Sequence, residues 1–168
     1  LQGDWSSDVC SSDLGHGLSM AIGCTVRDLR ASDRAAWDAL WQAYLDFYRE
    51  DLDPAITDLT FARLLDPSHP FFGLVAEQGG VLVGLVNSLV HASTWSRQGY
   101  CYLEDLYVSA DVRGGGIGRA LIEAVYARSD QLGLDRVYWI TDSGNTTAQG
   151  LYDKLATRAG IITYQREA

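Results

Sequence analysis

A glycine-rich stretch carries the strongest chemical signal in the sequence. It lies between a strand-like segment and a helical pattern, and it consists of Arg113, Gly114, Gly115, Gly116, Ile117, Gly118 and Arg119. Glycines let a backbone approach a ligand closely, and the free N–H groups of a helix N-terminus attract an anion. The stretch therefore predicts a pyrophosphate-binding loop, with a flexible loop that binds nothing as the competing interpretation.

Two common phosphate motifs do not fit this stretch. A dinucleotide fingerprint would need glycine at the positions of Arg119 or Leu121. A Walker A loop would need lysine followed by serine or threonine, but the only lysine is Lys154, outside the stretch. The ligand is therefore not expected to be bound in either of these two ways.

The pattern that remains is Q/R-x-x-G-x-G/A, which Arg113, Gly116 and Gly118 satisfy. Here the sequence resembles the GNAT superfamily of acetyl-CoA-dependent N-acetyltransferases, and the resemblance covers most of the chain from Cys24 onward. In that family the matching loop grips the pyrophosphate of acetyl-CoA. The resemblance thus implies cofactor binding by all seven residues from 113 to 119.

Three further segments carry the same resemblance. Residues 102–108, Tyr-Leu-Glu-Asp-Leu-Tyr-Val, precede the loop and are close to diamine and polyamine acetyltransferases. Residues 145–152 match the family pattern N-x-x-A-x-x-L/F-Y. Residues 154–164 look like the histone and polyamine acetyltransferase branch, although Ala156 and Thr157 stand where many relatives have Gly-Phe.

The resemblance implies a role for each matching residue. Leu106, Tyr107 and Val108 would pair through their backbone with the pantetheine arm, and Asn145 would hold the cofactor from the neighbouring strand. Tyr152 matches the usual general acid, which protonates the leaving thiolate. A tyrosine that only packs in the core is the alternative for Tyr152.

Glu104 is the candidate general base. The period of two along a strand predicts that Glu104 shares a face with Tyr102, Leu106 and Val108, toward the acceptor amine, and that Asp105 points to the opposite face in a structural role. A carboxylate there can take the ammonium proton directly or through water. A salt-bridged surface carboxylate is the alternative for Glu104.

A cluster of acidic residues suggests the charge of the acceptor. Glu50, Asp51 and Asp53 lie in a segment where Arg49 is the only basic residue. In the resembling family this segment walls the acceptor cleft, which favours a cationic acceptor such as a polyamine, an aminoglycoside or a basic peptide tail. A merely solvated face is the alternative.

The surrounding pattern predicts the elements that position these residues. Trp37, Leu40, Trp41, Tyr44, Leu45 and Tyr48 recur at helical spacing after a cap at Ser32-Asp33, so they predict a helix whose aromatic residues face the core. A second short helix is predicted from a cap at Thr57-Asp58 to Leu65. Strands are predicted over residues 24–29, 72–77, 81–90, 100–108, 136–141 and 161–166, and further helices over residues 117–132 and 145–157.

This order predicts one mixed α/β domain. By resemblance it is a GNAT fold of the α/β (α+β) class, with a central mixed, mostly antiparallel sheet, splayed fourth and fifth strands and flanking helices. Residues 1–19 are expected to be a non-native or disordered leader and residues 20–168 the acetyltransferase domain.

Composition excludes several classes of protein. The 168 residues carry a formal charge of −9, which argues against a nucleic-acid partner, and the sequence contains no apolar stretch that would span a membrane. Cys10, Cys24 and Cys101 form no metal or disulfide pattern, and His69 and His91 have no partner at metal-ligand spacing, so no metal and a cytoplasmic location are expected. His91, Trp95 and Tyr100 are candidates to line the acceptor pocket.

Together with the resemblance, these patterns predict an acetyl-CoA-dependent N-acetyltransferase that acts on a small cationic amine. Members of the resembling family are often dimers, so a homodimer is one possible assembly, and the oligomeric state stays open. Two other functions stay open. The acceptor could be a lysine or N-terminus of a protein, or the domain could bind acyl-CoA without catalysis in a regulatory role.

Overall fold

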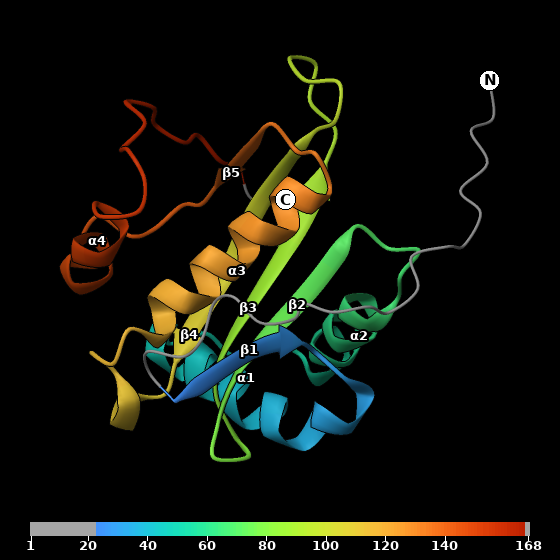
Figure 1. The fold of residues 1–168 in the computed structure, drawn as a ribbon, viewed down its shortest axis with the longest axis vertical. Helices are drawn as coiled ribbons and strands as arrows, with labels where there is room; N and C mark the ends of the chain where they lie inside the picture. The colour runs from blue at the N-terminus through green and yellow to red at the C-terminus, as the bar shows by residue number, and fades with distance from the viewer. Residues whose placement is uncertain (1–22, 167–168) are drawn as a thin grey trace.

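Five strands form one sheet in the computed structural model, which describes residues 23–166 (Figure 1). They are β1 (Cys24–Asp28), β2 (Phe71–Gln78), β3 (Val81–His91), β4 (Tyr100–Val108) and β5 (Arg136–Tyr138), and they lie side by side in chain order. The first four strands pair antiparallel, whereas β4 and β5 pair parallel. The predicted mixed, mostly antiparallel sheet is therefore confirmed.

Helices cover both faces of this sheet. α1 (Arg34–Tyr48) and α2 (Pro54–Leu65) pack on one face, and α3 (Ile117–Gln131) crosses the other (Figure 1). The short α4 (Thr146–Tyr152) lies beside the β5 end of the sheet, and two 3-10 turns complete the chain, η1 (Ala31–Asp33) and η2 (Ala110–Val112). The two faces bury separate cores, one under α3 and one under α1 and α2.

The apolar stripe of α1 forms the second core as predicted. Trp37, Leu40, Trp41 and Leu45 are buried, and Trp37 stacks on Trp41 with ring centroids 5.3 Å apart. Full burial of side chains of this size contributes about 1.5–3 kcal/mol each to folding, so the stripe fixes α1 against the sheet. The aromatic residues at this end of α1 are core residues.

The start of α2 differs from the predicted cap at Thr57-Asp58. Pro54 occupies the first turn instead, and Asp53 caps the helix by accepting a hydrogen bond of 2.9 Å from the backbone N–H of Ala55. Proline suits a first helical position because its missing N–H would have no partner there. Asp58 forms an ion pair with Arg34 of α1.

The C-terminal elements are shorter than predicted. β5 ends at Tyr138 and α4 at Tyr152, and residues 161–166 form no strand. A strand requires a neighbour that pairs with its N–H and C=O groups, and no such partner lies beside residues 161–166 in the described part of the chain. Ile161, Ile162 and Tyr164 are accordingly exposed.

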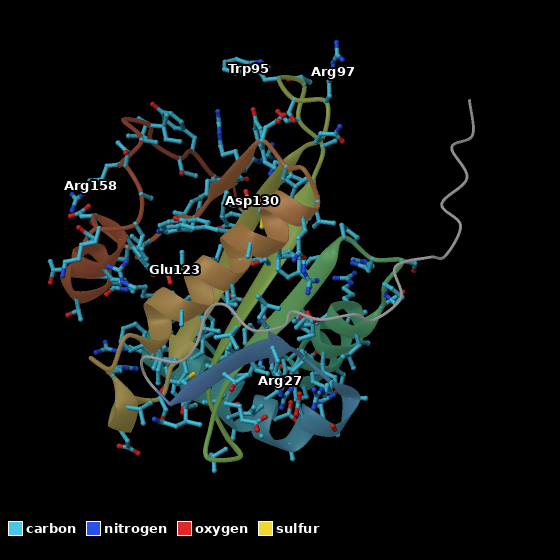
Figure 2. The ribbon with its side chains drawn as sticks, viewed as in Figure 1. Arg27, Trp95, Arg97, Glu123, Asp130 and Arg158 are labelled. Atoms are coloured by element: carbon cyan, nitrogen blue, oxygen red, sulfur yellow. The ribbon has the colours of Figure 1, made fainter. Side chains whose placement is uncertain are left out.

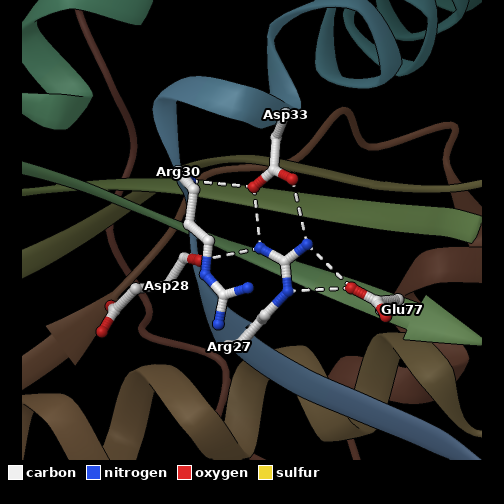
Figure 3. A network of polar contacts seen from close by, with 5 residues as sticks. All are labelled: Arg27, Asp28, Arg30, Asp33 and Glu77. Carbon is white, nitrogen blue, oxygen red and sulfur yellow. Dashed lines mark hydrogen bonds and ion pairs between the residues drawn. The ribbon is translucent and has the colours of Figure 1, made fainter. Parts of the chain in front are cut away.

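A network of ion pairs joins β1 and β2 to η1 (Figure 3). The Arg27 guanidinium binds both oxygens of Asp33, at 2.7 and 3.0 Å, and also reaches Glu77 on β2. The backbone N–H of Arg30 donates to the same Asp33 carboxylate at 2.8 Å. This network fixes the connection between β1 and α1.

Two further predictions concern the N-terminal residues and the absence of a membrane-spanning segment. The leader predicted at residues 1–19, and its boundary at Met20, lie outside the described residues. Within residues 23–166, every helix is too short or too polar to cross a bilayer.

Candidate active site

The site begins where β4 and β5 separate. Their ladder contains only the pairs Tyr100–Arg136, Cys101–Val137 and Tyr102–Tyr138. Beyond Tyr102, no strand of the described chain pairs with β4 on that edge, so backbone groups of the segment that contains Leu106, Tyr107 and Val108 are open to an extended ligand. The predicted splay is present, and these three residues lie at it.

The glycine-rich loop follows directly at the end of β4. Gly114 and Gly116 both have φ of 84°, a backbone conformation that glycine adopts without strain. A Cβ at Gly114 would meet nothing within 4 Å, so the loop leaves open space there. Gly116 is the N-cap of α3 without a side-chain cap, which leaves the first N–H groups of this 15-residue helix available to an anion. The loop therefore fits a diphosphate.

Gly118 connects this loop to α4. A Cβ at Gly118 would lie 3.2 Å from Cδ2 of Leu151 and 3.8 Å from Cγ2 of Val108. Glycine therefore lets the first turn of α3 approach α4 without a shift of the Leu151 side chain. Because Leu151 precedes Tyr152, this contact also places the candidate acid.

The two arginines at the ends of the loop, Arg113 and Arg119, make contacts with different elements. Arg113 Nε donates to the carbonyl oxygen of Val108 at 2.9 Å, and its guanidinium lies over the rings of Tyr107 and Phe47, at 5.4 and 5.7 Å. Arg113 thus ties the loop to α1. Arg119 lies on the first turn of α3 and pairs with Glu123 at 3.4 Å. Binding of the pyrophosphate by these two side chains stays a prediction.

Tyr152 is half-buried at the end of α4, with its ring 5.3 Å from that of Trp139. Burial raises the pKa of Tyr152 to about 12, and the hydroxyl of Tyr48 on α1 adds to the rise. The phenol therefore keeps its proton at neutral pH, as a general acid must. The effect of Tyr48 on this pKa places Tyr152 within electrostatic range of the end of α1.

Asn145 has a clear structural task. Its side-chain oxygen accepts a hydrogen bond of 3.3 Å from the backbone N–H of Ala148 and so caps α4. This cap explains the Asn at the start of the 145–152 pattern. The predicted role of Asn145 in cofactor binding stays a prediction.

A β-bulge in β4 overturns the predicted faces of Glu104 and Asp105. Asn87 pairs with Asp105 but the next residue, Ser88, pairs with Leu103, which leaves Glu104 as an extra residue. A bulge reverses the alternation of side chains along a strand. Leu103 consequently packs under α3, whereas Asp105 lies on the α1 face.

Leu106 and Val108 also contact the core under α3, so Glu104 does not share their face as predicted. The charge of Glu104 raises the pKa values of Tyr44 and Tyr102, so Glu104 lies within electrostatic range of α1. The assignment of Asp105 to the opposite face is therefore wrong. Both carboxylates face the α1 side, next to each other.

Burial and mutual repulsion perturb the two carboxylates. Partial desolvation raises the pKa of Glu104, and the neighbouring Asp105 raises it further. Burial also raises the pKa of Asp105, although hydrogen bonds from Tyr44 and Asn87 oppose the rise. A carboxylate with a raised pKa is a stronger base, which favours Glu104 as a proton acceptor.

The link between α1 and α2 carries Glu50, Asp51 and Asp53, which we call the acidic link. All three residues are exposed, and Asp53 caps α2. Their part in acceptor binding stays a prediction. Trp95 lies with Arg97 at the tip of the β3–β4 loop and is 87% exposed, so it points to solvent in this structure (Figure 2).

Three residues on the α1 face of the sheet were not identified as site candidates by the sequence analysis. Tyr44 and Tyr48 belong to the apolar stripe of α1, but they are only partly covered. Tyr44 hydrogen-bonds to Asp105, and Tyr48 raises the pKa of Tyr152. Asn87 interrupts an apolar strand, and its Nδ2 donates to Asp105 Oδ2 at 3.1 Å. A polar residue within an apolar strand was the sequence signal that could have identified Asn87. His91 bonds Tyr138 at 2.9 Å, farther along the same face.

A cavity of about 450 Å³ borders the site at Tyr152. Its walls come from residues 137–141, from α4 and from residues 156–163. It does not include the glycine-rich loop or Glu104. Among the described residues, no three His, Cys, Asp or Glu side chains gather in a way that could hold a metal ion.

Comparison with known proteins agrees with this geometry. The model of the acetyltransferase (GNAT) family matches residues 37–156. A D-amino-acid N-acetyltransferase of Saccharomyces cerevisiae is 38% identical over 143 residues, which cover 84% of this chain and 89% of the yeast protein. A phosphinothricin N-acetyltransferase of Alcaligenes faecalis is 30% identical over 158 residues, covering 87% of this chain and 77% of that protein.

Solved structures show the same fold. A ribosomal-protein-alanine N-acetyltransferase from Brucella melitensis superposes with a TM-score of 0.74 at 21% identity, covering 86% of this chain and 99% of that one. Together with the splayed strands and the glycine-rich loop, these matches establish that the chain belongs to the GNAT family of acetyltransferases.

Proposed function

We propose that this protein transfers an acetyl group from acetyl-CoA to a primary amine of a small cationic acceptor, such as a polyamine or an aminoglycoside. The observation that carries the proposal is the β4 bulge, which turns the Glu104 and Asp105 carboxylates to the α1 side, next to the splay of β4 and β5. A cationic amine is attracted to such a pair. The acidic link adds negative charge at the end of α1.

Each part of the site would bind one part of the donor. The backbone N–H groups of residues 114–119 would hold the pyrophosphate, and the open edge of Leu106, Tyr107 and Val108 would hold the pantetheine arm. When bound, acetyl-CoA supplies a thioester, an activated acetyl group. Arg113 would keep the loop against α1 through Tyr107 and Phe47.

The transfer then needs one base and one acid. Glu104 takes a proton from the acceptor ammonium, and the free amine attacks the carbonyl carbon, so that a C–N bond forms and the C–S bond breaks. Tyr152 gives its proton to the departing thiolate. The surplus proton on the new amide nitrogen returns through solvent to Tyr152, and Glu104 releases its proton to solvent, so each turnover yields one amide, one thiol and one proton.

Two other functions compete with this proposal. A protein lysine or N-terminus would use the same donor site with a larger acceptor. A regulatory domain would bind acyl-CoA without turnover, but it would need neither a basic carboxylate nor a protonated phenol beside the splay. The amino-acid substrate named for the yeast relative adds D-amino acids to the acceptors worth testing.

Thiol release from acetyl-CoA across a panel of amines distinguishes these functions. The panel contains spermidine, an aminoglycoside, D-amino acids and a basic peptide, and thermal stabilisation by CoA is measured in parallel. Turnover with spermidine or the aminoglycoside is expected. Turnover only with the peptide, or only with D-amino acids, would contradict the cationic small-molecule acceptor, and stabilisation by CoA without any turnover would support a binding domain.

Tyr152→Phe tests the acid. We expect kcat to fall about 10²-fold or more, because a positioned acid contributes about 10²–10⁴-fold, while the Kd of CoA stays near that of the wild type. Tyr126→Phe is the matched control, since Tyr126 is also half-buried but its hydroxyl donates to the carbonyl oxygen of Leu155 at 3.1 Å. Equal kcat in Tyr152→Phe and wild type would rule out the assigned role.

A further inference from the structure

Asn87 presents an unexplained polar group under α1. Its side chain lies in the middle of β3 and is 3% exposed. Nδ2 donates to Asp105, but the buried Oδ1 has no hydrogen-bond partner among the described residues. Buried acceptors in proteins are nearly always paired, so an unpaired one points to a group that joins the site from outside.

Asp105 is the second part of this arrangement. Asn87 Nδ2 binds its Oδ2 at 3.1 Å, and the Tyr44 hydroxyl also hydrogen-bonds to the carboxylate. No ion pair between residues of the described chain includes either Asp105 or its neighbour Glu104. The two carboxylates thus lie side by side without a protein cation to balance them.

The Asn87 amide oxygen and the Asp105 carboxylate favour the same kind of ligand. A carboxylate and an amide oxygen both accept hydrogen bonds, and a primary ammonium has three donors and no acceptor. An aliphatic ammonium would pair with the amide oxygen and balance the carboxylate at the same time. A neutral hydroxyl would leave the charge of Asp105 unbalanced, and an anion would be repelled.

We propose that Asn87 and Asp105, braced by Tyr44, form the subsite that holds the reacting ammonium group of the acceptor. The inference rests on the proposed function and assigns the binding step to Asp105 and Asn87, beside Glu104 as the base. Tyr44 fixes Asp105 from α1, so helix and sheet both shape the subsite. The acceptor class is a primary aliphatic amine that is protonated when it binds.

The test measures the KM of both substrates, with the best amine of the acceptor panel. Asp105→Asn is expected to raise the KM of the amine about 10-fold or more, since it removes a charge-assisted hydrogen bond, and to leave the KM of acetyl-CoA within about 2-fold. Asn87→Leu, which keeps the carboxylate and the side-chain size, should raise the KM of the amine as well. Asp130→Asn on α3, on the other face of the sheet, is the matched control and should change neither KM (Figure 2).

The possible outcomes separate the two proposals. If no amine in the panel is acetylated, the proposed function fails. If amines are acetylated but both variants keep the wild-type KM of the amine, the subsite is wrong. A parallel rise of both KM values with a lower melting temperature would show that Asp105 and Asn87 only stabilise the bulge, which would also overturn the inference. Should Asp105→Asn fail to fold, Asn87→Leu alone decides by the same criteria.

Discussion

Replacement of Gly118 by valine tests how the donor loop and the acid are held together. The Cβ atom of the valine would lie 3.2 Å from Cδ2 of Leu151 and 3.8 Å from Cγ2 of Val108. The contact with Leu151 is tighter than an ordinary van der Waals contact, so Leu151 must shift by a few tenths of an ångström, and the added methyl groups extend beyond the Cβ atom. We expect α4 to move away from α3.

The magnitude follows from the packing. Overfilling a packed contact costs about 1–3 kcal/mol, which in a protein of this size lowers the melting temperature by about 2–12 °C. Gly150→Val is the matched control, since Gly150 is also helical but a Cβ there would meet nothing within 4 Å. Valine has a slightly better helix propensity than glycine, so this control should change stability by less than about 0.5 kcal/mol.

The assay combines urea unfolding with steady-state kinetics. Gly118→Val should lose both stability and kcat, because Leu151 precedes Tyr152 and its displacement moves the phenol. Gly150→Val should keep both near the wild-type values. Equal losses of unfolding free energy in the two variants would refute the packing argument, and a destabilised Gly118→Val with wild-type kcat would refute the link to Tyr152.

Three further predictions concern charge. In the wild type, kcat/KM should rise with pH as the base loses its proton, and the raised pKa of Glu104 shifts this rise to higher pH. Glu104→Gln should remove the rise, and an unchanged pH–rate profile would exclude Glu104 as the base. Replacement of all three carboxylates of the acidic link by the corresponding amides should raise the KM of a cationic amine several-fold and leave the KM of acetyl-CoA unchanged. If neither KM changes, the acidic link is a solvated surface without a role in binding. Arg27 holds the pKa of Asp33 below its ordinary value, so the stabilisation is present above about pH 4 and is lost as the pH falls through the folded value. Asp33→Asn should therefore cost about 1–3 kcal/mol of unfolding free energy at pH 7 and nothing below both pKa values. Loss of the exposed Asp153 partner of Arg158 should leave the unfolding free energy almost unchanged.

Local patterns predicted most of the fold. The stripe of α1, the glycine-rich loop and the start of α3 follow from short-range rules of period, capping and backbone conformation. The C-terminal elements were predicted too long because a strand such as residues 161–166 depends on a pairing partner. No local pattern reports whether that partner is present.

The faces of Glu104 and Asp105 show the same limit within the site. A period of two assumes an unbroken ladder, and the bulge opposite Asn87 breaks it. Nothing in residues 100–108 marks the extra residue, because the register depends on how β3 and β4 pack between α1 and α3. Asn87 itself was visible only as a polar interruption in an apolar strand.

The sequence by itself determined the family, the candidate donor-binding loop and the candidate acid, because these depend on residue types at short, fixed spacing. The tertiary structure alone decided which side chains meet at the proposed acceptor subsite. It joined Tyr44 of α1, Asn87 of β3 and Asp105 of β4, which are far apart along the chain, and it placed both carboxylates on one side of the sheet. Such contacts depend on the register of two strands and the packing of a helix on them, and these are properties of the whole fold.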